Sequence, residues 1–327
     1  MRVGFAGLTH GHVWGLIDHF AAVPEFEMAA VADSTPLMEM GGKNFAAQYS
    51  DWREMLDREN LDVVVVTNDN LEAANVMVEA LGRGIHTFKE KPMAASASDA
   101  QRVLEAWDNS GATLMINWPF CWNSWPHMIH KRIAKGEIGH VFHLRYRNGH
   151  HGPKEIGCDE YFVGWLYDEA KNGGGAIADF CGYGAALARW YFGMPESVFA
   201  VRDNYTKDYD VPDDHAICVL KYPRANVVLE GTWATFGFDQ SANPVVHGKA
   251  GTFGVYGDEV RLFRAGQEPQ ASDEKYTPGP DPASYFLNAI QNQREPEGML
   301  NPRIAADACR IVDAAKQSAR SGCAEGP

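Results

Sequence analysis

The sequence contains no long apolar run, no paired-cysteine motif and no excess of positive charge. None of its hydrophobic stretches approaches the roughly 20 residues of a membrane-spanning helix. Its six cysteines show no Cys-x-x-Cys pair and no zinc-like spacing, a pattern typical of buried thiols in a reducing compartment. The formal net charge of -14 argues against binding to nucleic acid or to an anionic membrane surface. It says little about small substrates, since the charge of a pocket need not follow the net charge.

The chain has 327 residues, of which 45% are hydrophobic, so it can form two domains that each bury a core. No internal repeat and no long low-complexity segment interrupts it. The first residues, Met1 to Phe5, enter a strand directly and show no signal peptide. Together with the cysteine pattern, this predicts a cytoplasmic protein.

The first 120 residues alternate between strand and helix patterns. The run Leu61 to Thr67 is almost entirely β-branched, which is typical of a strand buried on both faces of a parallel sheet. We expect Ser98 to cap a helix, with Gln101 reaching back to it. The pattern predicts a doubly wound parallel sheet, a Rossmann domain over residues 1–120. The expected strands cover 2–6, 26–32, 61–67, 85–88 and 112–118. The expected helices cover 16–22, 37–48, 72–81 and 98–107, and a further helix starts at Asp51 with a capping-box pattern.

A glycine-bearing turn follows the first strand and precedes a helix, which is the context of a dinucleotide fingerprint. Gly7 can make the tight first turn. Thr9 stands where a second glycine would let backbone approach a pyrophosphate, His12 occupies the third position, and Gly11 can take over part of that work. The turn alone is weak evidence, because many strand-to-helix turns contain two glycines.

Asp33 ends the second strand, where a carboxylate can accept hydrogen bonds from the adenosine ribose hydroxyls. It would repel a 2′-phosphate, and no arginine follows it closely, so the sequence favours NAD over NADP. The alternative is that Asp33 only caps the next helix. Asn68 and Asp69 follow the strand that ends near Thr67 and are expected to face the same crevice.

Lys91 follows the strand at residues 85–88 within Phe88-Lys89-Glu90-Lys91-Pro92. Ligands of open α/β sheets bind at such strand ends. Pro92 fixes its own φ and favours an extended Lys91. An isolated Glu-Lys-Pro is more often an ordinary loop, so the weight of this motif depends on the rest of the chain.

The second half of the chain, residues 121–327, is richer in strands without intervening helices. Such strands predict an open, largely antiparallel sheet with helices, one face of which can pair with another subunit. Closing helices are expected at residues 285–293 and 304–320. The expected strands cover 141–147, 197–202, 215–222, 226–235, 245–247, 252–256 and 259–264.

Two further motifs lie in this half. His150 and His151 are adjacent, but no third ligand stands at a metal-like spacing, so a polar or substrate-contacting loop is the better interpretation and no metal is expected. Three glycines, 173–175, precede a helix in which Asp179 and Tyr183 are four residues apart and share one face. Close helix packing, with Asp179 at the positive end of the helix dipole, would explain the same residues.

Taken together, these motifs resemble the Gfo/Idh/MocA oxidoreductases over nearly the whole chain. The resemblance rests on the 61–67 strand, Glu90-Lys91-Pro92, Gly173-Gly174-Gly175-Ala176 with Asp179, and Ile311-Val312-Asp313-Ala314-Ala315 with Ser318. It implies a nicotinamide cofactor on the first domain and an oligomer, a homodimer or homotetramer, through the second. It also implies a catalytic lysine, Lys91, and an aspartate four residues before a histidine. Tyr183 stands in place of that histidine, as in the glucose–fructose oxidoreductase and dimeric dihydrodiol dehydrogenase branches.

The predicted reaction is hydride transfer between nicotinamide and a secondary alcohol of a sugar, polyol or cyclitol. Tyr183 is the candidate general acid or base, Lys91 would stabilise alkoxide character, and Asp179 would orient Lys91 or bind a substrate hydroxyl. The predicted substrate pocket adds Trp118, Trp122, His150, His151 and Trp165. The predicted cofactor-binding residues are Gly7, Thr9, His10, Gly11, His12, Asp33, Thr67, Asn68, Asp69, Glu90 and Lys91.

Two other functions fit the same residues. A redox-assisted glycoside-cleaving enzyme would oxidise and then reduce one sugar, without net formation of NADH. A non-catalytic nucleotide-binding sensor would bind the cofactor without turnover. The identity of the substrate and the direction of the reaction are not encoded in these motifs.

Overall fold

The computed structural model describes residues 1–238, 240–272 and 274–327, and it divides into two compact units. Residues 157–173 and 279–309 fold with the N-terminal residues, whereas a division at residue 120 assigns them to the second domain. Unit 1 consists of Met1–Trp118, Gly157–Gly173 and Gly279–Cys309, and unit 2 consists of Pro119–Ile156, Gly174–Pro278 and Arg310–Pro327.

Unit 1 contains a six-stranded parallel sheet in the order β3-β2-β1-β4-β5-β6. This order reverses between β1 and β4, and the predicted doubly wound sheet is therefore confirmed. Every residue of β4 is buried, as the β-branched run predicts. The strands are β1 (Arg2–Ala6), β2 (Glu27–Ala32), β3 (Ala47–Tyr49), β4 (Val63–Val66), β5 (His86–Glu90) and β6 (Leu114–Asn117).

One strand of this sheet was not predicted. The expected helix over residues 37–48 is wrong in its second half, where the chain forms a 3₁₀ turn at Gly42–Asn44 and then β3. The paired glycines Gly41 and Gly42 stand at this break, and glycine is among the poorest helix formers. β3 is short and completes the outer edge of the sheet beside β2.

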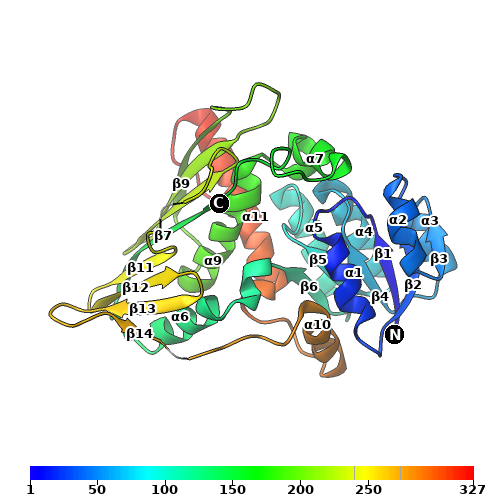
Figure 1. Cartoon of the computed structure of the whole chain (residues 1–327), viewed down its shortest axis with the longest axis horizontal. Helices are drawn as coiled ribbons and strands as arrows, with labels where there is room; N and C mark the ends of the chain where they lie inside the picture. Colours follow the sequence, from blue (N-terminus) through cyan, green and yellow to red (C-terminus); the bar gives the residue numbers. More distant parts are fainter. Residues whose placement is uncertain (239, 273) are drawn as a thin grey trace. The chain divides into compact units, whose positions relative to one another are not determined.

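Helices cover both faces of the unit 1 sheet; Figure 1 shows α1 in front of the strands and α4 and α5 behind them. Side chains cap three helices that follow strands of this sheet: Asp51 accepts from the N–H of Arg53, and Asp69 accepts from that of Glu72. The third cap is Ser96, so the expected cap at Ser98 is wrong. The helices are α1 (Val13–Ala21), α2 (Leu37–Gly41), α3 (Trp52–Arg58), α4 (Asn70–Gly82), α5 (Ala97–Asp108), α7 (Glu160–Leu166), α8 (Glu169–Asn172) and α10 (Pro282–Gln291).

A chain of aromatic contacts runs through the core of unit 1. Phe20 lies edge-on to both Phe5 and Phe88, with ring centroids 5.7 and 5.3 Å apart. Phe88 in turn meets Phe286 of α10 at 5.6 Å. These contacts explain why a segment from late in the sequence folds with the first 118 residues, since each ring buries a large apolar surface.

Unit 2 contains an eight-stranded sheet in the order β14-β13-β12-β11-β7-β10-β9-β8. Its neighbouring strands are antiparallel except for β7 and β10, so the predicted largely antiparallel sheet is confirmed. The strands are β7 (Val141–Gly149), β8 (Ser197–Asp203), β9 (His215–Lys221), β10 (Asn226–Thr232), β11 (Val245–Gly248), β12 (Gly251–Tyr256), β13 (Glu259–Phe263) and β14 (Gln270–Ala271).

The helices of unit 2 include a π-helical segment. The residues after the three glycines form η3 (Ile177–Cys181) with π geometry before α9 (Gly182–Phe192) begins. Other helical segments are η2 (Pro119–Trp122) and α6 (Ser124–Ala134), while α11 (Pro302–Ser321) contributes residues to both units.

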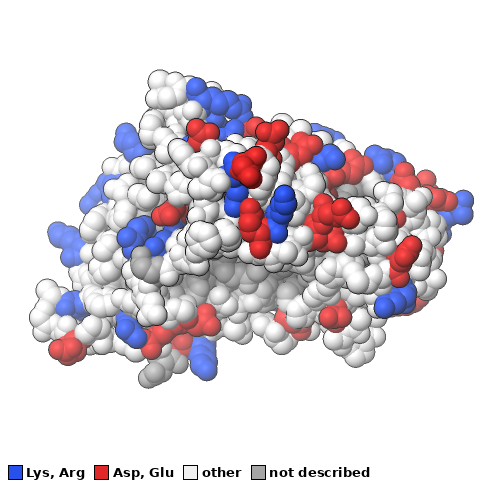
Figure 2. Space-filling model, turned by 45° about the horizontal axis from the view of Figure 1, so that its top comes forward, with Lys and Arg blue, Asp and Glu red and all other residues white. Residues whose placement is uncertain are grey.

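No helix within the described residues is long and apolar enough to cross a membrane. On the face drawn in Figure 2, acidic and basic side chains are interspersed. The negative net charge is therefore not gathered into a single patch on that face.

Candidate functional site

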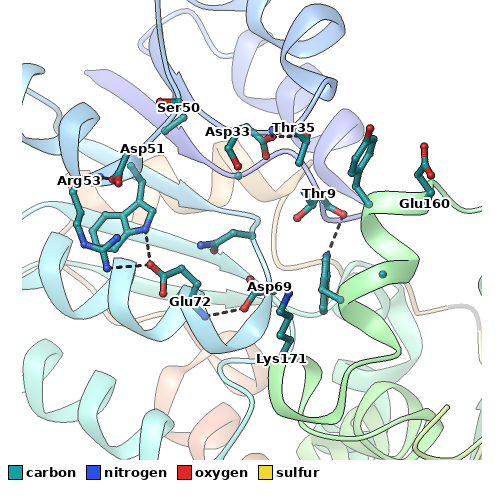
Figure 3. Close-up of a pocket in the computed structure, with 18 residues that line it drawn as sticks. Thr9, Asp33, Thr35, Ser50, Asp51, Arg53, Asp69, Glu72, Glu160 and Lys171 are labelled. Atoms are coloured by element: carbon teal, nitrogen blue, oxygen red, sulfur yellow. Dashed lines mark hydrogen bonds and ion pairs between the residues drawn. The ribbon is translucent and has the colours of Figure 1, made fainter. Parts of the chain in front are cut away.

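A cavity of about 640 Å³ lies at the carboxyl-end edge of the unit 1 sheet (Figure 3). Residues that follow β1, β2, β3 and β4 line it on one side, and residues of α7 and α8 line it on the other. All of these belong to unit 1. The lining residues are Gly7, Thr9, Ala32, Asp33, Ser34, Thr35, Ser50, Asp51, Trp52, Arg53, Asn68, Asp69, Glu72, Glu160, Tyr161, Gly164, Trp165 and Lys171.

Gly7 forms the tight turn that the sequence predicts. Its φ of 92° lies in the region that favours glycine, and a Cβ there would meet the backbone N of Asn68 at 2.6 Å. The buried hydroxyl of Thr67 donates to the carbonyl of Gly7 at 2.7 Å, which fixes the turn to the end of β4. The sequence therefore needs glycine here so that two strand ends can pass closely beside the cavity.

The first turn of α1 is not capped by a side chain. His12 occupies the N-cap position without a side-chain hydrogen bond to the helix, and its own N–H donates to Nδ1 of His10 at 3.1 Å. Since the first N–H groups of a helix lack partners within the helix, such an end suits an anion. His10 is buried, and His12 and Gly11 are exposed; none of the three lines the cavity.

Asp33 lines the cavity and is buried. One carboxylate oxygen accepts from the N–H of Leu8 at 2.6 Å, and the other accepts from the N–H and hydroxyl of Thr35 at 2.7 and 2.5 Å. The N-cap of α2 is Pro36, so Asp33 does not cap that helix. The carboxylate instead ties the turn after β1 to the end of β2, at the edge of the cavity.

The outer wall of the cavity comes from the end of β3 and the start of α3. The guanidinium of Arg53 lies over the ring of Trp52, 4.0 Å from its centroid. Glu72 accepts from the indole N–H of Trp52 at 2.8 Å and pairs with Arg53 at 3.1 Å. Sequence reasoning missed this group because it missed β3, whose carboxyl end places Ser50 and Asp51 beside the cavity.

The opposite wall is built by residues 160–171 of α7 and α8. The indole N–H of Trp165 donates to the carbonyl of Thr9 at 3.4 Å, and its ring lies 5.9 Å from that of His10. Trp165, a predicted substrate contact, lines the same cavity as Asp33 and Gly7. Tyr161, Glu160 and Lys171 were not predicted at all, because nothing in the sequence assigns this segment to unit 1.

Lys91 directly follows the end of β5, as expected, although it does not line the cavity. Its backbone N–H donates to the buried Glu90 carboxylate at 2.7 Å. The same carboxylate accepts from Asn117 at 3.1 Å and lies 2.9 Å from Nδ1 of His12. Glu90 therefore connects the turn that presents Lys91 to the first turn of α1.

Two buried bases lie beside Lys91. Burial, reinforced by the charges of His12, Lys89 and Lys91, holds the pKa of His10 well below its usual value. Burial also lowers the pKa of Lys89 to about 7. The ammonium of Lys89 donates to the Glu90 carbonyl and, at 3.3 Å, to Oδ1 of Asn70.

In unit 2, Asp179 lies in η3 and Tyr183 in the first turn of α9. Both are buried, and Asp179 accepts from the indole N–H of Trp233 at 3.0 Å. The ring of Tyr183 packs 5.2 Å from that of Phe120 and 6.4 Å from that of Phe180. The four-residue spacing thus spans a π segment and an α-helix instead of a single α-helical face.

Asp213 fixes the three-glycine segment, and sequence reasoning missed it. Its buried carboxylate accepts from the N–H groups of Gly175 and Ile177 at 3.0 and 2.8 Å and from Arg202 at 3.0 Å. A Cβ at Gly175 would lie 2.0 Å from the Asp213 carbonyl oxygen, so this approach requires glycine. Burial raises the pKa of Asp213, against the backbone hydrogen bonds and the charge of Arg202.

The remaining predicted substrate residues belong to different parts of the fold. Trp118 is buried at the end of unit 1, and Trp122 is half-buried in unit 2. His150 and His151 lie in a loop after β7, as predicted, where their rings meet Phe180 and Phe236 at 5.1 and 4.0 Å. Among residues 1–238, 240–272 and 274–327, no group of three or more His, Cys, Asp or Glu could hold a metal ion.

The residues of the unit 1 cavity fit a nicotinamide dinucleotide. Oδ1 of Asn68 is buried at the cavity wall, and no donor among the described residues reaches it. A buried acceptor without a partner is costly unless a ligand or water supplies a donor. Gly7 brings backbone to the cavity wall, and α1, whose first turn has no side-chain cap, begins after the same turn, as in a pyrophosphate site.

Comparisons with known proteins agree with this geometry. Residues 2–118 match the model of the oxidoreductase family with an NAD-binding Rossmann fold, and residues 127–254 match the Gfo/Idh/MocA C-terminal domain. The two matches cover most of the chain and follow one another in the family's order. They identify the N-terminal Rossmann domain as NAD-binding.

Curated relatives are similar over only part of their length. Inositol 2-dehydrogenase of Salmonella typhimurium is 32% identical over 106 residues, which is 32% of each chain. Levoglucosan dehydrogenase of Pseudarthrobacter phenanthrenivorans is 23% identical over 203 residues, 61% of this chain and 51% of the relative. The matched segments thus span about a third to a half of these enzymes.

Solved structures match over the full length. A levoglucosan dehydrogenase in complex with NADH and levoglucosan superposes with a TM-score of 0.80 at 19% identity, covering 100% of this chain and 99% of the other. At that identity the likeness shows the fold alone. The two family models match most of the chain, and the fold, the cavity and the Glu90-Lys91-Pro92 turn agree with them. The chain belongs to the Gfo/Idh/MocA family of oxidoreductases.

Proposed function

We propose that the protein is an NAD-dependent dehydrogenase or reductase that acts on a secondary alcohol of a sugar, polyol or cyclitol. The observation that carries the proposal is the cavity at the carboxyl-end edge of the unit 1 sheet, with Asp33 on its wall. Lys91 stands at the end of a neighbouring strand of the same sheet. Binding at this edge is the rule for open α/β sheets.

The charges of the cavity support NAD over NADP. Asp33 is the ribose-facing candidate, and Asp51, Asp69, Glu72 and Glu160 line the same cavity. Arg53, the cation near the end of β2 and β3, is already paired with Glu72. An additional 2′-phosphate would meet carboxylates here, and like charges in a partly desolvated site repel strongly.

The bound NAD would supply a hydride acceptor or donor at nicotinamide C4. Lys91 would hydrogen-bond the reacting substrate oxygen and stabilise its alkoxide character. Glu90 would hold the backbone of Lys91 in place through the 2.7 Å hydrogen bond. Tyr183, as general acid or base, and Asp179, as a substrate-binding or orienting residue, belong to unit 2, and their roles stay predictions from the sequence.

The proposed substrate class follows the names of the relatives, which include inositol and levoglucosan dehydrogenases. Both substrates carry several secondary hydroxyl groups on a ring. A substrate of this kind would need polar and aromatic contacts, and Trp118, Trp122, His150 and His151 stay candidates for them.

We also propose that the chain forms a homodimer or homotetramer through the unit 2 sheet. Phe199 and Val201 on β8 and Ile217 and Val219 on β9 are exposed, while the residues between them are buried. Strands that alternate in this way expose one face of the sheet, and an exposed apolar face is typical of an interface. A cytoplasmic location stays a prediction from the cysteine pattern.

Calorimetric titration of the purified protein, stripped of carried-over nucleotide, with NAD(H) and NADP(H) tests the proposal. We expect tighter binding of NAD(H), followed by net NADH formation with a cyclic polyol or sugar. Tighter binding of NADP(H) would overturn the role of Asp33 but keep the oxidoreductase. Failure to bind either would overturn the proposed function. Binding without turnover would indicate the non-catalytic sensor, and turnover without net NADH would indicate redox-assisted cleavage.

A further inference from the structure

The unit 1 cavity is unusually acidic for a site that binds a doubly charged pyrophosphate. Five carboxylates line it, from Asp33, Asp51, Asp69, Glu72 and Glu160. The turn after β1 offers less backbone access than a three-glycine fingerprint, because Thr9 and His12 replace two of its glycines. The cavity therefore needs a positive charge that this turn does not provide.

Two cationic side chains line the cavity, and they differ in how freely each could pair with a ligand. Arg53 is paired with Glu72 at 3.1 Å and lies flat on the Trp52 ring, so its charge is already compensated. Lys171 is exposed on the other wall, and none of the described side chains forms an ion pair with its ammonium. Figure 3 shows its side chain reaching from α8 toward Asp69.

The backbone around Lys171 is held on both sides. Asp168 caps α8 and accepts from the N–H groups of Ala170 and Lys171 at 2.9 and 3.3 Å. The next residue, Asn172, is buried, and its Oδ1 accepts from Asn70 at 2.9 Å. The position of Lys171 beside the cavity is thus set before any ligand binds, which reduces the entropy that binding must overcome.

The hydrogen bonds that hold Asn172 are linked to the turn that carries Lys91. Oδ1 of Asn70 accepts from the buried ammonium of Lys89 at 3.3 Å, and Lys89 also donates to the carbonyl of Glu90. Unit 1 therefore links the end of β5, the start of α4 and the end of α8 through one buried polar chain. This chain explains why residues 157–173 belong to unit 1.

We propose that Lys171 binds the pyrophosphate of the dinucleotide and supplies the charge that the altered turn after β1 lacks. This inference rests on the proposed NAD function and adds a cofactor-binding residue that is distant from the fingerprint in sequence. An exposed lysine on a preset backbone forms a charge-assisted hydrogen bond with a phosphate oxygen when the ligand fills the cavity. Trp165, six residues earlier, closes the same wall by its contact with Thr9.

Calorimetric binding of NADH and of ADP-ribose to wild type, Lys171→Met and Lys171→Arg tests the inference without relying on turnover. We expect Lys171→Met to weaken both ligands by about tenfold or more, as loss of a charged hydrogen bond implies. Lys171→Arg should restore most of the affinity, and the wild-type affinity should fall more steeply with salt than that of Lys171→Met. Lys43→Met, an exposed lysine of unit 1 outside the cavity, is the matched control and should bind like wild type.

The outcomes separate this inference from the function on which it rests. Wild-type binding of NADH with unchanged affinity in Lys171→Met would overturn the role of Lys171 alone. Absence of NADH binding by the wild type would overturn the proposed function and this inference together. An equal loss of affinity in Lys171→Met and Lys43→Met would show that the effect comes from the general surface charge, and it would also contradict the inference.

Discussion

The two sheets of this chain bury their strands differently. In unit 1, β4 is buried at every residue, and β1 and β5 are buried except at their first residue. In unit 2, β8 and β9 bury alternate residues and expose the others. A sheet with both faces covered can offer a ligand only its ends, whereas a sheet with one bare face offers that face.

This difference separates two kinds of binding within one chain. The carboxyl ends of the parallel strands carry the turns and caps that surround the cavity, including Gly7, Asp33 and Asp69. The exposed positions of β8 and β9 carry the apolar side chains Phe199, Val201, Ile217 and Val219, with Asp203 and Lys221 at the strand ends. We therefore expect substitutions at strand ends in unit 1 to change chemistry and ligand binding, and substitutions on the open face of unit 2 to change association.

The largest effect is expected at a strand end, from Lys91→Met. Loss of the ammonium that stabilises the reacting oxygen should reduce kcat by about 10³-fold. NADH affinity, measured by calorimetry, should stay within about twofold of wild type, because Lys91 does not line the cavity. A variant with an unchanged rate would rule out this role of Lys91.

The next effect concerns the stability of unit 2. Asp213→Ala removes the acceptor of two backbone N–H groups in the three-glycine segment and the carboxylate partner of Arg202. Breaking such a buried pair should reduce the free energy of unfolding by about 3–5 kcal/mol. Urea unfolding measures it, with Asp203→Ala, at an exposed carboxylate on β8, as the control. Equal stability of the two variants would contradict the anchoring role of Asp213.

A smaller effect concerns Lys89, whose pKa burial lowers to about 7. An unfolded lysine titrates near 10.4, so between about pH 7 and 10 the unfolded chain holds a proton that the folded chain has released. The free energy of unfolding of wild type should therefore rise with pH, relative to Lys89→Met, by up to about 1.4 kcal/mol per pH unit. Below pH 7 both states are charged and the burial penalty is fully present.

Four groups act on this titration: Glu90, Asp69 and Cys309 favour the charged Lys89, and Lys91 disfavours it. Urea unfolding of wild type and Lys89→Met at pH 6, 7.5 and 9 measures the difference. Parallel stability curves over this range would show that Lys89 keeps an ordinary pKa in the folded protein.

The smallest expected change lies on the open face of unit 2. Phe199→Glu places a charge where 43% of an apolar side chain is exposed, and it should weaken self-association by about tenfold or more. Leu71→Glu, at an equally exposed position in unit 1, is the matched control. Sedimentation equilibrium measures both. A wild type that is monomeric at micromolar concentration would disprove the predicted oligomer.

The sequence predicted most of unit 1 because its signals are local. The β-branched run 61–67, the turn at Gly7 and the position of Lys91 after a strand each depend on neighbouring residues. The structure confirms the turn and the position of Lys91, and it places β4 at Val63–Val66 within the run. β3 was missed because three residues at a sheet edge carry little periodicity of their own. Because β3 was missed, Trp52 and Arg53, which follow it and line the cavity, are absent from the predicted site.

The rest of the site depends on contacts between distant segments. Trp165 forms a hydrogen bond with Thr9, which is 156 positions away in the sequence, and Asn172 accepts one from Asn70, which is 102 positions away. Asp213 accepts a hydrogen bond from the backbone of Gly175, which is 38 positions away in the sequence. No periodicity or capping rule encodes such pairs, because each residue alone fits an ordinary loop or helix. The π segment at η3 was missed for a related reason, since its spacing looks α-helical in sequence.

The discontinuity of unit 1 has a consequence for synthesis. A ribosome adds roughly 5–20 residues per second, and domains tend to fold as they emerge. The six parallel strands are all made by residue 117, but the wall with Trp165 comes later, and the Phe286 that covers Phe88 comes near the end. We therefore expect the strands of the nascent chain to be complete before the Trp165 wall is made, and its ability to retain a nucleotide to appear only late.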